Sequence, residues 1–256
     1  MRKTVVISFA NQKGGVGKTT TVSEVGENLA RKFDKKVLLV DMDPQSSLTT
    51  IKSNMHKIIQ EDMKTISNVM MKQANLEDII INIKKNLDIA PATLLLSDVE
   101  LNLVNATMRE IILQKAINKI KGDYDYILID CPPSRGLLTV NALSASDYVM
   151  IPVQAEYQAL LGMQLLKNTI KNVQREINSE LKVGGYIITM TSHTNHSNET
   201  AESIKNDKFN TIVEIPRSID VADAGVSNIS TNEYNANNKA GLEYLRLAKY
   251  ISEVEV

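Results

Sequence analysis

The segment Thr4–Thr20, TVVISFANQKGGVGKTT, decides the fold. Its first seven residues form a β-branched apolar run that is typical of a buried strand, and Thr20–Phe33 then carries apolar side chains at helical spacing. A glycine-rich loop joins the two. Glycines let backbone N–H groups crowd around a phosphate, and the start of a helix adds further donors and a positive dipole. The segment therefore predicts a strand, a phosphate-binding loop and a helix in succession.

The same alternation of strands and helices continues along the chain. Short apolar runs predict strands at Lys36–Val40, Leu87–Ala90, Tyr126–Ile129, Tyr148–Val153, Gly185–Met190 and Thr211–Ile215. Helices are expected at 97–121, Leu160–Ile177 and 239–254, with mixed helical signal over 55–83 (Ile79, Ile80 and Ile83) and a polar loop at 191–200. This pattern predicts an α/β fold, a doubly wound and mostly parallel sheet flanked by helices. We expect a single domain over residues 1–256.

The composition excludes several classes of function. The chain has 29 Lys and Arg against 30 Asp and Glu, a formal net charge of −1, so any contact with nucleic acid must come from a local patch. Aromatic residues make up only 4%, which disfavours a base-stacking platform. The one cysteine, Cys131, cannot form an intrachain disulfide, which favours a reducing, cytoplasmic compartment. No apolar run approaches the length of a transmembrane helix.

The glycine-rich loop carries the side chains that phosphate chemistry needs. Lys18 can reach the β- and γ-phosphates, the Thr19 hydroxyl can ligate Mg²⁺, and Thr20 can bond the α-phosphate. The common phosphate-loop template fails at its first position, where Gln12 replaces glycine. A glycine-rich turn without a ligand is the alternative, but the strand before it and the helix after it disfavour that interpretation. The candidate ATP-binding residues are Lys13, Gly14, Gly15, Val16, Gly17, Lys18, Thr19 and Thr20.

Acidic residues follow two of the predicted strands. Asp41 and Asp43 lie in DMDPQ after the second strand, and Asp130 ends the strand YILI. Ligands bind at the carboxyl ends of strands in such sheets, and an acid at this point can hold Mg²⁺ through water. Either segment alone could be a helix cap or a turn. Together with the phosphate loop they predict a metal site formed by Thr19, Asp43 and Asp130.

KGGVGKT with an extra lysine near its start is the deviant Walker A motif, and here the sequence resembles the ParA and MinD superfamily of P-loop ATPases. The resemblance implies that Lys13 crosses to the nucleotide of a second subunit in an ATP-sandwiched dimer. A cation near the γ-phosphate stabilises the transition state, as an arginine finger does. It also implies that Asp43 orients the attacking water and that Asp41 supports the metal shell and the loop. The implied catalytic residues are Lys13, Lys18, Asp43 and Asp130.

The resemblance extends to the expected adenine-binding edge. The segment 214–218, EIPRS, is similar to the family's I-P-R-N segment, which packs on adenine and hydrogen-bonds it. Pro216 matches, whereas Ser218 stands where asparagine is usual, which puts that hydrogen bond in doubt. Met190 is expected to pack on the same base. Residues 124–143 resemble the second switch segment, and Cys131 is then a small apolar filler beside the site.

Branches of the superfamily can be separated by what the sequence contains. A single cysteine excludes the nitrogenase iron protein, which needs two per subunit. The chain ends in EVEV, and this acidic end argues against the basic membrane-binding helix of MinD-type proteins. The phosphate loop begins within the first 15 residues, so we expect the compact chromosomal (Soj-type) or small plasmid class, without an added helix-turn-helix domain.

The resemblance implies a slow, partner-stimulated ATP hydrolase that works with ATP and Mg²⁺. It further implies an ATP-dependent homodimer, nonspecific DNA binding, a ParB-like centromere-binding partner, no membrane contact, and a cytoplasmic, nucleoid-associated location. Candidate DNA contacts, which could equally be ordinary solvated charges, are Lys205, Lys208, Arg217, Lys239, Arg246 and Lys249. Two alternatives stay open: a ParA-like ATPase that positions a protein complex without DNA, and a biosynthetic ATPase of the dethiobiotin-synthetase type. DMDPQ and DCPPS argue against the second.

Overall fold

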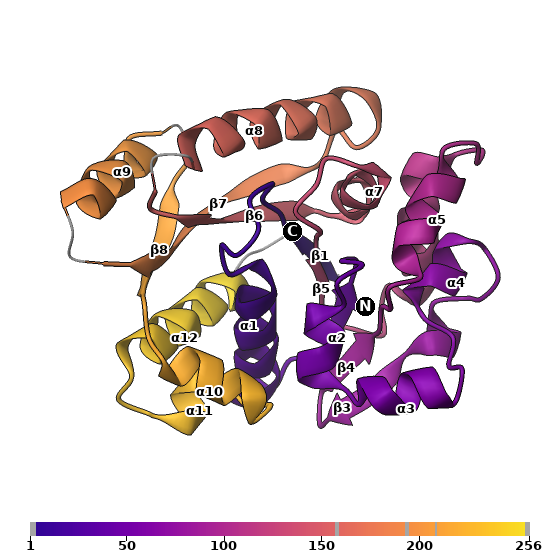
Figure 1. Ribbon diagram of the computed structural model, residues 1–256, viewed down its shortest axis with the longest axis horizontal. Helices are drawn as coiled ribbons and strands as arrows, with labels where there is room; N and C mark the ends of the chain where they lie inside the picture. The colour runs from indigo at the N-terminus through magenta and orange to yellow at the C-terminus, as the bar shows by residue number, and fades with distance from the viewer. Residues whose placement is uncertain (1–3, 157–158, 193–194, 208, 254–256) are drawn as a thin grey trace.

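One mixed sheet organises the molecule. The computed structural model describes residues 4–156, 159–192, 195–207 and 209–253, and in them the strands run in the order β3-β4-β2-β5-β1-β6-β7-β8 (Figure 1). The strands are β1 (Val5–Phe9), β2 (Val37–Asp41), β3 (Ile81–Lys84), β4 (Leu87–Ala90), β5 (Tyr126–Asp130), β6 (Tyr148–Gln154), β7 (Lys182–Thr191) and β8 (Thr211–Pro216). Each described pairing is parallel except that of β3 with β4. The predicted doubly wound, mostly parallel sheet is confirmed.

Helices cover both faces of this sheet. They are α1 (Lys18–Lys32), α2 (Ser47–Lys52), α3 (Met55–Gln60), α4 (Ile66–Met70), α5 (Leu96–Leu103), α6 (Ile112–Ile120), α7 (Leu137–Ala145), α8 (Ala159–Glu176), α9 (Asn195–Lys205), α10 (Asp220–Val226), α11 (Thr231–Tyr234) and α12 (Lys239–Ser252), with short 3₁₀ turns at Glu77–Ile79 and Arg109–Ile111. Helices α4 to α9 share one apolar core with the sheet, and α1, α2 and α12 share the other. Among the described residues, no helix is both long enough and apolar enough to span a membrane.

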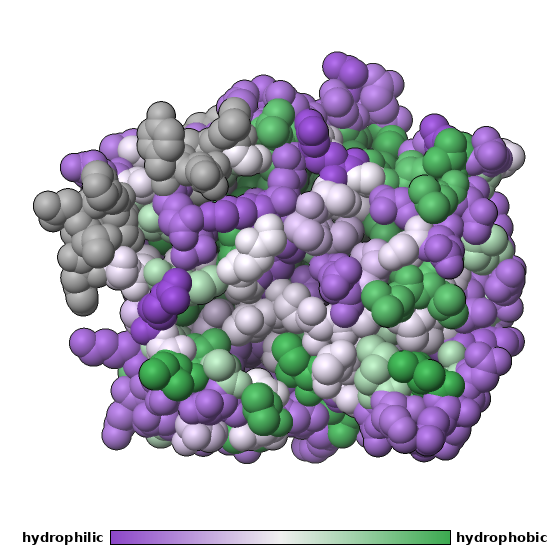
Figure 2. Space-filling view, viewed as in Figure 1, coloured by the Kyte–Doolittle hydropathy of each residue, from purple (hydrophilic) through white to green (hydrophobic). Residues whose placement is uncertain are grey.

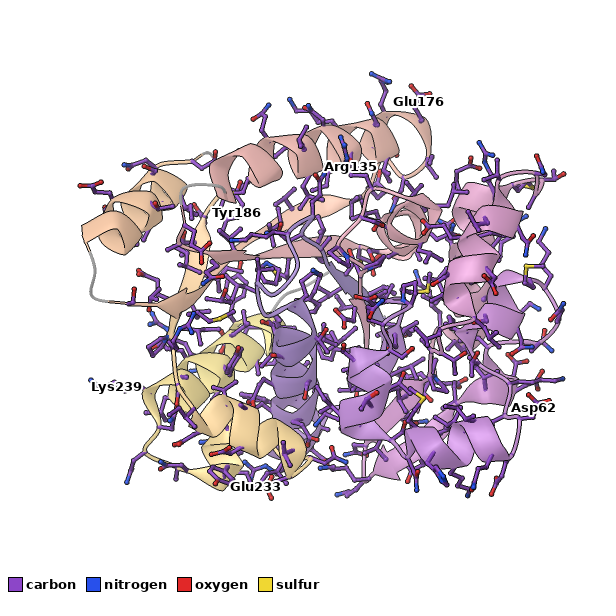
Figure 3. The ribbon with its side chains drawn as sticks, in the orientation of Figure 1. Asp62, Arg135, Glu176, Tyr186, Glu233 and Lys239 are labelled. Atoms are coloured by element: carbon purple, nitrogen blue, oxygen red, sulfur yellow. The ribbon has the colours of Figure 1, made fainter. Side chains whose placement is uncertain are left out.

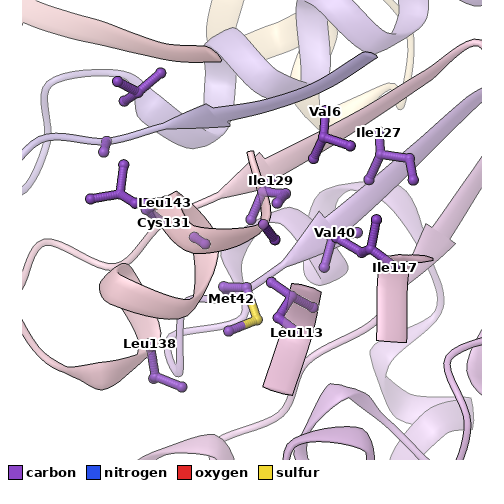
Figure 4. Close-up of a cluster of buried hydrophobic side chains, with 14 of the residues drawn as sticks. Val6, Val40, Met42, Leu113, Ile117, Ile127, Ile129, Cys131, Leu138 and Leu143 are labelled. Carbon is purple, nitrogen blue, oxygen red and sulfur yellow. The ribbon is translucent and has the colours of Figure 1, made fainter. Parts of the chain in front are cut away.

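Alternate residues of each strand enter opposite cores, because successive side chains of a strand point to opposite faces. Val6 and Ile127 pack toward α6 and α7 in the first core (Figure 4), whereas Ile7 and Leu128 belong to the second core, beside α1. All four side chains are fully buried. Burial on both faces explains why these strands appear in the sequence as continuous apolar runs rather than as alternating ones.

Three local predictions were correct only in part. Residues 55–83 form α3, α4, a 3₁₀ turn and the edge strand β3, in which Ile83 lies, rather than a helical segment. Residues 97–121 break into α5 and α6, and Met108 between them adopts a left-handed φ of 55°. Much of the expected loop at 191–200 is the start of α9. That helix is polar on most of its surface but buries Ala201 and Ile204, which packing against the sheet can stabilise despite its loop-like composition.

Candidate functional site

The phosphate loop joins the carboxyl end of β1 to α1. Gly15 and Gly17 have φ angles of 74° and 81°, a left-handed conformation that side chains rarely adopt. A Cβ built on Gly14 or on Gly15 would meet no atom within 4 Å, so the loop borders open space. The loop therefore has the backbone shape and the room that a chain of phosphates requires.

Two side chains that the sequence analysis did not single out hold this loop in place. Asn11 donates from Nδ2 to the Pro152 carbonyl at 2.7 Å, and its Oδ1 accepts from the Lys13 backbone N–H at 3.0 Å. Thr189 on β7 donates from Oγ1 to the Val16 carbonyl at 2.9 Å. These bonds fix the loop to β6 and β7, so its donors are arranged before any ligand arrives. The local sequence gives little indication of the Asn11–Pro152 and Thr189–Val16 bonds, because the two residues of each bond are far apart in the chain.

Lys18, Thr19 and Asp130 meet at the start of α1. Thr19 Oγ1 donates to Asp130 Oδ2 at 2.6 Å, and Lys18 Nζ donates to the Lys13 carbonyl at 3.2 Å. Burial lowers the pKa of Lys18, and the nearby charge of Asp130 opposes that shift. Burial, followed by the charge of Asp41, raises the pKa of Asp130 well above its usual range.

The residues at this point fit a hydrated Mg²⁺ ion. Asp130 Oδ1 is buried and has no hydrogen-bond partner within the described residues. A buried carboxylate oxygen without a partner is costly, and a water bound to a metal ion would satisfy it. The Thr19 hydroxyl beside it supplies a second oxygen of the kind that Mg²⁺ prefers.

Asp41 and Asp43 lie at the neighbouring strand end. The register of β2 and β5 places Asp41 opposite Asp130. Asp41 Oδ1 accepts from the Asp43 N–H at 3.1 Å, while its Oδ2 accepts from the N–H and the hydroxyl of Thr49 at 2.9 and 2.7 Å. Burial raises the pKa of Asp41 to about 6. Both oxygens of Asp41 are thus used to shape the loop that carries Asp43, whose Oδ1 accepts from the Gln45 N–H at 2.9 Å.

Lys13 forms an ion pair within its own chain. Its ammonium group contacts the carboxylate of Glu156, which follows β6. The two side chains are 30% and 48% exposed, so water screens the pair. Glu156 was not anticipated, because nothing in its local sequence marks it as a partner of a lysine 143 residues away.

Comparison with known proteins gives consistent matches over nearly the whole chain. A family model described as an AAA domain matches residues 4–183. The chain is 40% identical to the sporulation initiation inhibitor protein Soj of Bacillus subtilis (strain 168), over 96% of this chain and 98% of that protein. It is 38% identical to the chromosome-partitioning ATPase Soj of Treponema pallidum (strain Nichols), over 98% of this chain and 97% of that protein. The chain belongs to the ParA/Soj family of partition ATPases.

A solved structure adds a ligand to the comparison. The crystal structure of cobyrinic acid a,c-diamide synthase from Mycobacterium smegmatis, with bound ATP analogue and magnesium, superposes with a TM-score of 0.82. That protein is 31% identical in sequence, and the match covers 97% of this chain and 94% of that one. The resemblance to the ParA and MinD superfamily inferred from the motifs is thereby confirmed, whereas the roles of single residues stay predictions.

The edge predicted to bind adenine in this ParA/Soj chain lies at the ends of β7 and β8. The register places Thr191 opposite Pro216, and Met190 has a left-handed φ of 51°. A Cβ on Gly17 would lie 3.8 Å from Met190 Cε, so the methionine borders the phosphate loop. Ser218 is already engaged, because its Oγ accepts from Asn238 Nδ2 at 2.8 Å. The structure thus brings Met190 and Pro216 to one edge and gives the Ser218 hydroxyl a partner within the protein.

Three of the six candidate DNA contacts, Lys205, Arg246 and Lys249, are paired with carboxylates. Lys205 Nζ lies 2.9 Å from Glu202 and 2.8 Å from Glu214, and the two bonds raise its pKa. Arg246 lies 3.8 Å from Glu243, and Lys205 and Arg246 border the same hollow of about 720 Å³ together with Glu214 and Glu243. These cations therefore share their surface with acidic groups.

The other candidate cations are spread over the C-terminal part of the chain. Lys249 lies 3.9 Å from Glu253, Arg217 follows β8, and Lys239 begins α12 and points away from the molecule (Figure 3). Lys208 lies outside the described residues. The described candidates do not gather into one uniformly basic patch.

Apolar side chains are exposed near the Asp43 loop. A hollow of about 830 Å³ is lined by Gln45 and Ser46 at one end and by α3 and residues 93–95 elsewhere. Ile59, Leu94 and Leu101 are between 65% and 73% exposed, and hydrophobic surface gathers over α3 and α5 (Figure 2). Exposed apolar patches of this kind are typical of surfaces that contact other proteins.

Proposed function

We propose that this chain is an ATP-driven DNA-segregation switch. It binds ATP with Mg²⁺ at Lys13–Thr20 and dimerises around the nucleotide. The dimer binds DNA nonspecifically, and a ParB-like partner releases it by stimulating hydrolysis. The observation that carries this proposal is the pairing of Thr19 with Asp130, whose other oxygen is buried beside an open phosphate loop and has no partner among the described residues. Such a switch works in the cytoplasm, on the nucleoid.

Binding relies on groups that are already in position. The backbone N–H groups of the loop and Lys18 hold the phosphates. Thr19 and Asp130 would hold Mg²⁺, the hydroxyl of Thr19 directly and the carboxylate of Asp130 through water. Bound Mg²⁺ supplies positive charge that offsets the negative charge of the phosphates. Met190 and Pro216 then pack against the base at the far end of the site.

Hydrolysis requires a water aligned with the γ-phosphate. Asp43 orients this water, and Asp41 fixes the Asp43 loop through the bonds described above. Lys13 acts on the nucleotide of the second subunit, where its charge stabilises the transition state. In the single chain Lys13 is bound to Glu156 instead. We therefore expect slow hydrolysis until the dimer and a partner complete the site.

DNA binding depends on the dimer in this proposal. One chain carries a net charge of −1, and Lys205, Arg246 and Lys249 have acidic neighbours, so a single copy offers little attraction for phosphates. Two copies would place two weak patches on one surface. Binding should then be ATP-dependent and should weaken steeply as salt rises.

A second candidate function, a ParA-like ATPase that positions a protein complex without DNA, is favoured by the apolar surface. Exposed apolar side chains over α3 and α5 fit a protein partner better than they fit the phosphate backbone of DNA. Retardation of duplex DNA by ATP-loaded protein at low salt separates the two candidates. Lys13→Ala, which removes the group that acts across the dimer, should abolish retardation. If the ATP-loaded parent retards no duplex, DNA segregation is excluded and the positioning function is favoured.

The site itself is tested by ATP binding and turnover. Asp43→Ala should keep ATP binding and dimerisation but lose hydrolysis, because it removes one hydrogen bond to the Gln45 N–H and leaves the bonds of Asp41 to the loop and to Thr49 in place. Lys18→Ala should lose nucleotide affinity. Glu176→Ala is the control, since this carboxylate is 60% exposed at the far end of α8, away from the site (Figure 3). Full hydrolysis by Asp43→Ala, or unchanged ATP binding by Lys18→Ala, would contradict the assigned roles.

A further inference from the structure

A buried ionic cluster lies away from the phosphate loop, between α1, α2, β3 and the turn after α10. Lys52 Nζ lies 2.6 Å from Glu27 Oε1 and 3.1 Å from Asn228 Oδ1. Lys84 Nζ lies 3.0 Å from Glu27 Oε1 and donates to the Asn228 carbonyl at 3.0 Å. The side chains of Glu27 and Lys52 are 1% and 0% exposed. One carboxylate and one backbone turn thus hold two ammonium groups.

Such a cluster is a costly way to fill a core. Removing two charges from water costs several kcal/mol per ion, and apolar residues of the same volume are often as stabilising or more so. Burial lowers the pKa of Lys52 against the opposing effect of Glu27, and Glu27 Oε2 is buried with no hydrogen-bond partner in the described part of the chain. Hydrogen bonds between charged groups are directional, however, so they fix the relative placement of the elements that carry them.

Both residues belong to the elements of the proposed ATP site. Glu27 lies on α1, the helix that begins with Lys18 at the phosphate loop. Lys52 is the last residue of α2, which begins immediately after the loop that carries Asp43. Thr49, on the same short helix, is bound to Asp41. Helix α2 is therefore fastened to the sheet by one side chain and to α1 by another.

The cluster continues into the C-terminal part of the chain. Asn228 lies in the turn between α10 and α11 and has a left-handed φ of 52°. Glu24, three residues before Glu27 on α1, accepts from the backbone N–H of Thr231 at 2.8 Å and from its hydroxyl at 2.6 Å. Glu24 thus binds one end of residues 228–231 directly, and Glu27 reaches the other end through Lys52 and Lys84. This turn follows the predicted adenine-binding edge along the chain and precedes α12.

We propose that Glu27 and Lys52 are positioning residues that couple the Asp43 loop to the turn at residues 228–231. A change in the position of α2 on ATP binding is passed through Lys52 to Asn228, and from there to the surface formed by α10, α11 and α12. The proposal rests on the proposed function, because it assumes that Asp43 acts on a nucleotide bound at α1. It adds a route by which the nucleotide state reaches a surface that Asp43 does not touch.

The test uses three variants of the full chain: Lys52→Met, Glu27→Gln, and the two together. Lys52→Met alone leaves Glu27 with Lys84 as its single cation, so we expect it to lower the thermal midpoint. The double variant removes both buried charges, those of Glu27 and Lys52, and should therefore recover much of that loss. Lys85→Met is the control, because Lys85 is the neighbour of Lys84 but its side chain is 85% exposed.

Kinetics separate positioning from stability. The double variant should keep its KM for ATP within about threefold, because Lys13–Thr20 is untouched, while kcat falls at least about tenfold. Misplacing a catalytic group by about 1 Å costs up to about a hundredfold in rate. A merely structural role would lower the thermal midpoint and leave kcat unchanged in the folded protein. Parent-like kcat in a folded double variant overturns the proposal.

Hydrogen exchange tests the coupling without relying on turnover. In the parent, a non-hydrolysable ATP analogue with Mg²⁺ should slow amide exchange at residues 228–234, and in the double variant it should bind without that effect. If the parent binds the analogue but hydrolyses no ATP, the proposed hydrolytic function fails, while the exchange response still decides the coupling. An analogue that binds the parent and leaves residues 228–234 unchanged overturns the coupling.

Discussion

Replacing Glu156 by glutamine tests how Lys13 is controlled. Glutamine keeps the shape of the side chain and removes the charge that holds the Lys13 ammonium in its own subunit. The two side chains are 30% and 48% exposed, and exposed pairs of this kind contribute about 0.2–1 kcal/mol. A symmetric dimer in which each Lys13 crosses to its neighbour must break two such pairs, which costs about 0.4–2 kcal/mol. At about 1.4 kcal/mol per tenfold, Glu156→Gln should tighten the ATP dimer by about 2- to 30-fold.

Sedimentation of ATP-loaded protein measures this change directly. The comparison is made in an Asp43→Ala background, so that the nucleotide persists during the run. The difference between the proteins with and without Glu156→Gln should shrink as salt rises, because salt screens the pair in the monomer. Glu176→Gln is the matched control, since it removes one partner of an exposed pair with Arg175 at the far end of α8 (Figure 3).

The outcome has a clear sign. If Glu156→Gln weakens the dimer or leaves it unchanged, the pair does not compete with the crossing of Lys13. Weaker dimerisation would be the result if Glu156 contacted the second subunit, because the substitution would then remove a contact between subunits. An equal gain from Glu176→Gln would show that overall charge, rather than the release of Lys13, drives the association.

Two further predictions concern packing and the metal site. Gly241→Ala should destabilise the protein by about 1–3 kcal/mol in urea unfolding, because its Cβ would lie 2.8 Å from the Asn232 backbone nitrogen. Gly225→Ala, whose Cβ would meet nothing within 4 Å, should stabilise it by about 0.5–1 kcal/mol, and the same sign for both would contradict this reasoning. Asp130→Asn should raise the thermal midpoint of nucleotide-free protein in EDTA, since the raised pKa of Asp130 means that stability is lost as pH rises above the carboxyl's unfolded value. The same variant should weaken binding of ATP with Mg²⁺ at least about tenfold, and unchanged affinity would remove Asp130 from the metal site.

The sequence predicts well what depends on local pattern. Strands buried on both faces are continuous apolar runs, so the residue that follows each run can be placed at the edge of the sheet where ligands bind. That is why Asp41 and Asp130 could be brought together before the register of β2 and β5 was known. The glycines of the phosphate loop are similarly local, because a left-handed backbone at Gly15 and Gly17 restricts the residue type.

Contacts between distant segments could not be predicted in this way. Glu27 and Lys52 sit among polar residues on amphipathic segments, and periodicity alone assigns such charges to solvent. They are buried because the turn at Asn228 closes over them, and that turn lies 176 residues beyond Lys52. The edge strand β3 failed for a related reason. It is only half-buried and pairs with a single neighbour, so its isoleucines resemble one face of a short helix.

The net charge of −1 has a different meaning once the pairs are known. Counting treats each lysine as free, whereas Lys13, Lys52 and Lys205 each have a carboxylate within bonding distance. A cation that keeps such a partner adds little net attraction for a phosphate, and one that exchanges its partner gains only the difference between the two contacts. An anionic ligand at the partly exposed Lys13 or Lys205 must therefore displace a carboxylate, whereas the buried Lys52 is out of its reach. In the proposed function, attraction for DNA therefore depends on which of these cations keep a carboxylate partner in each nucleotide state. The partner that each cation keeps is then set by geometry rather than by the total charge of the chain.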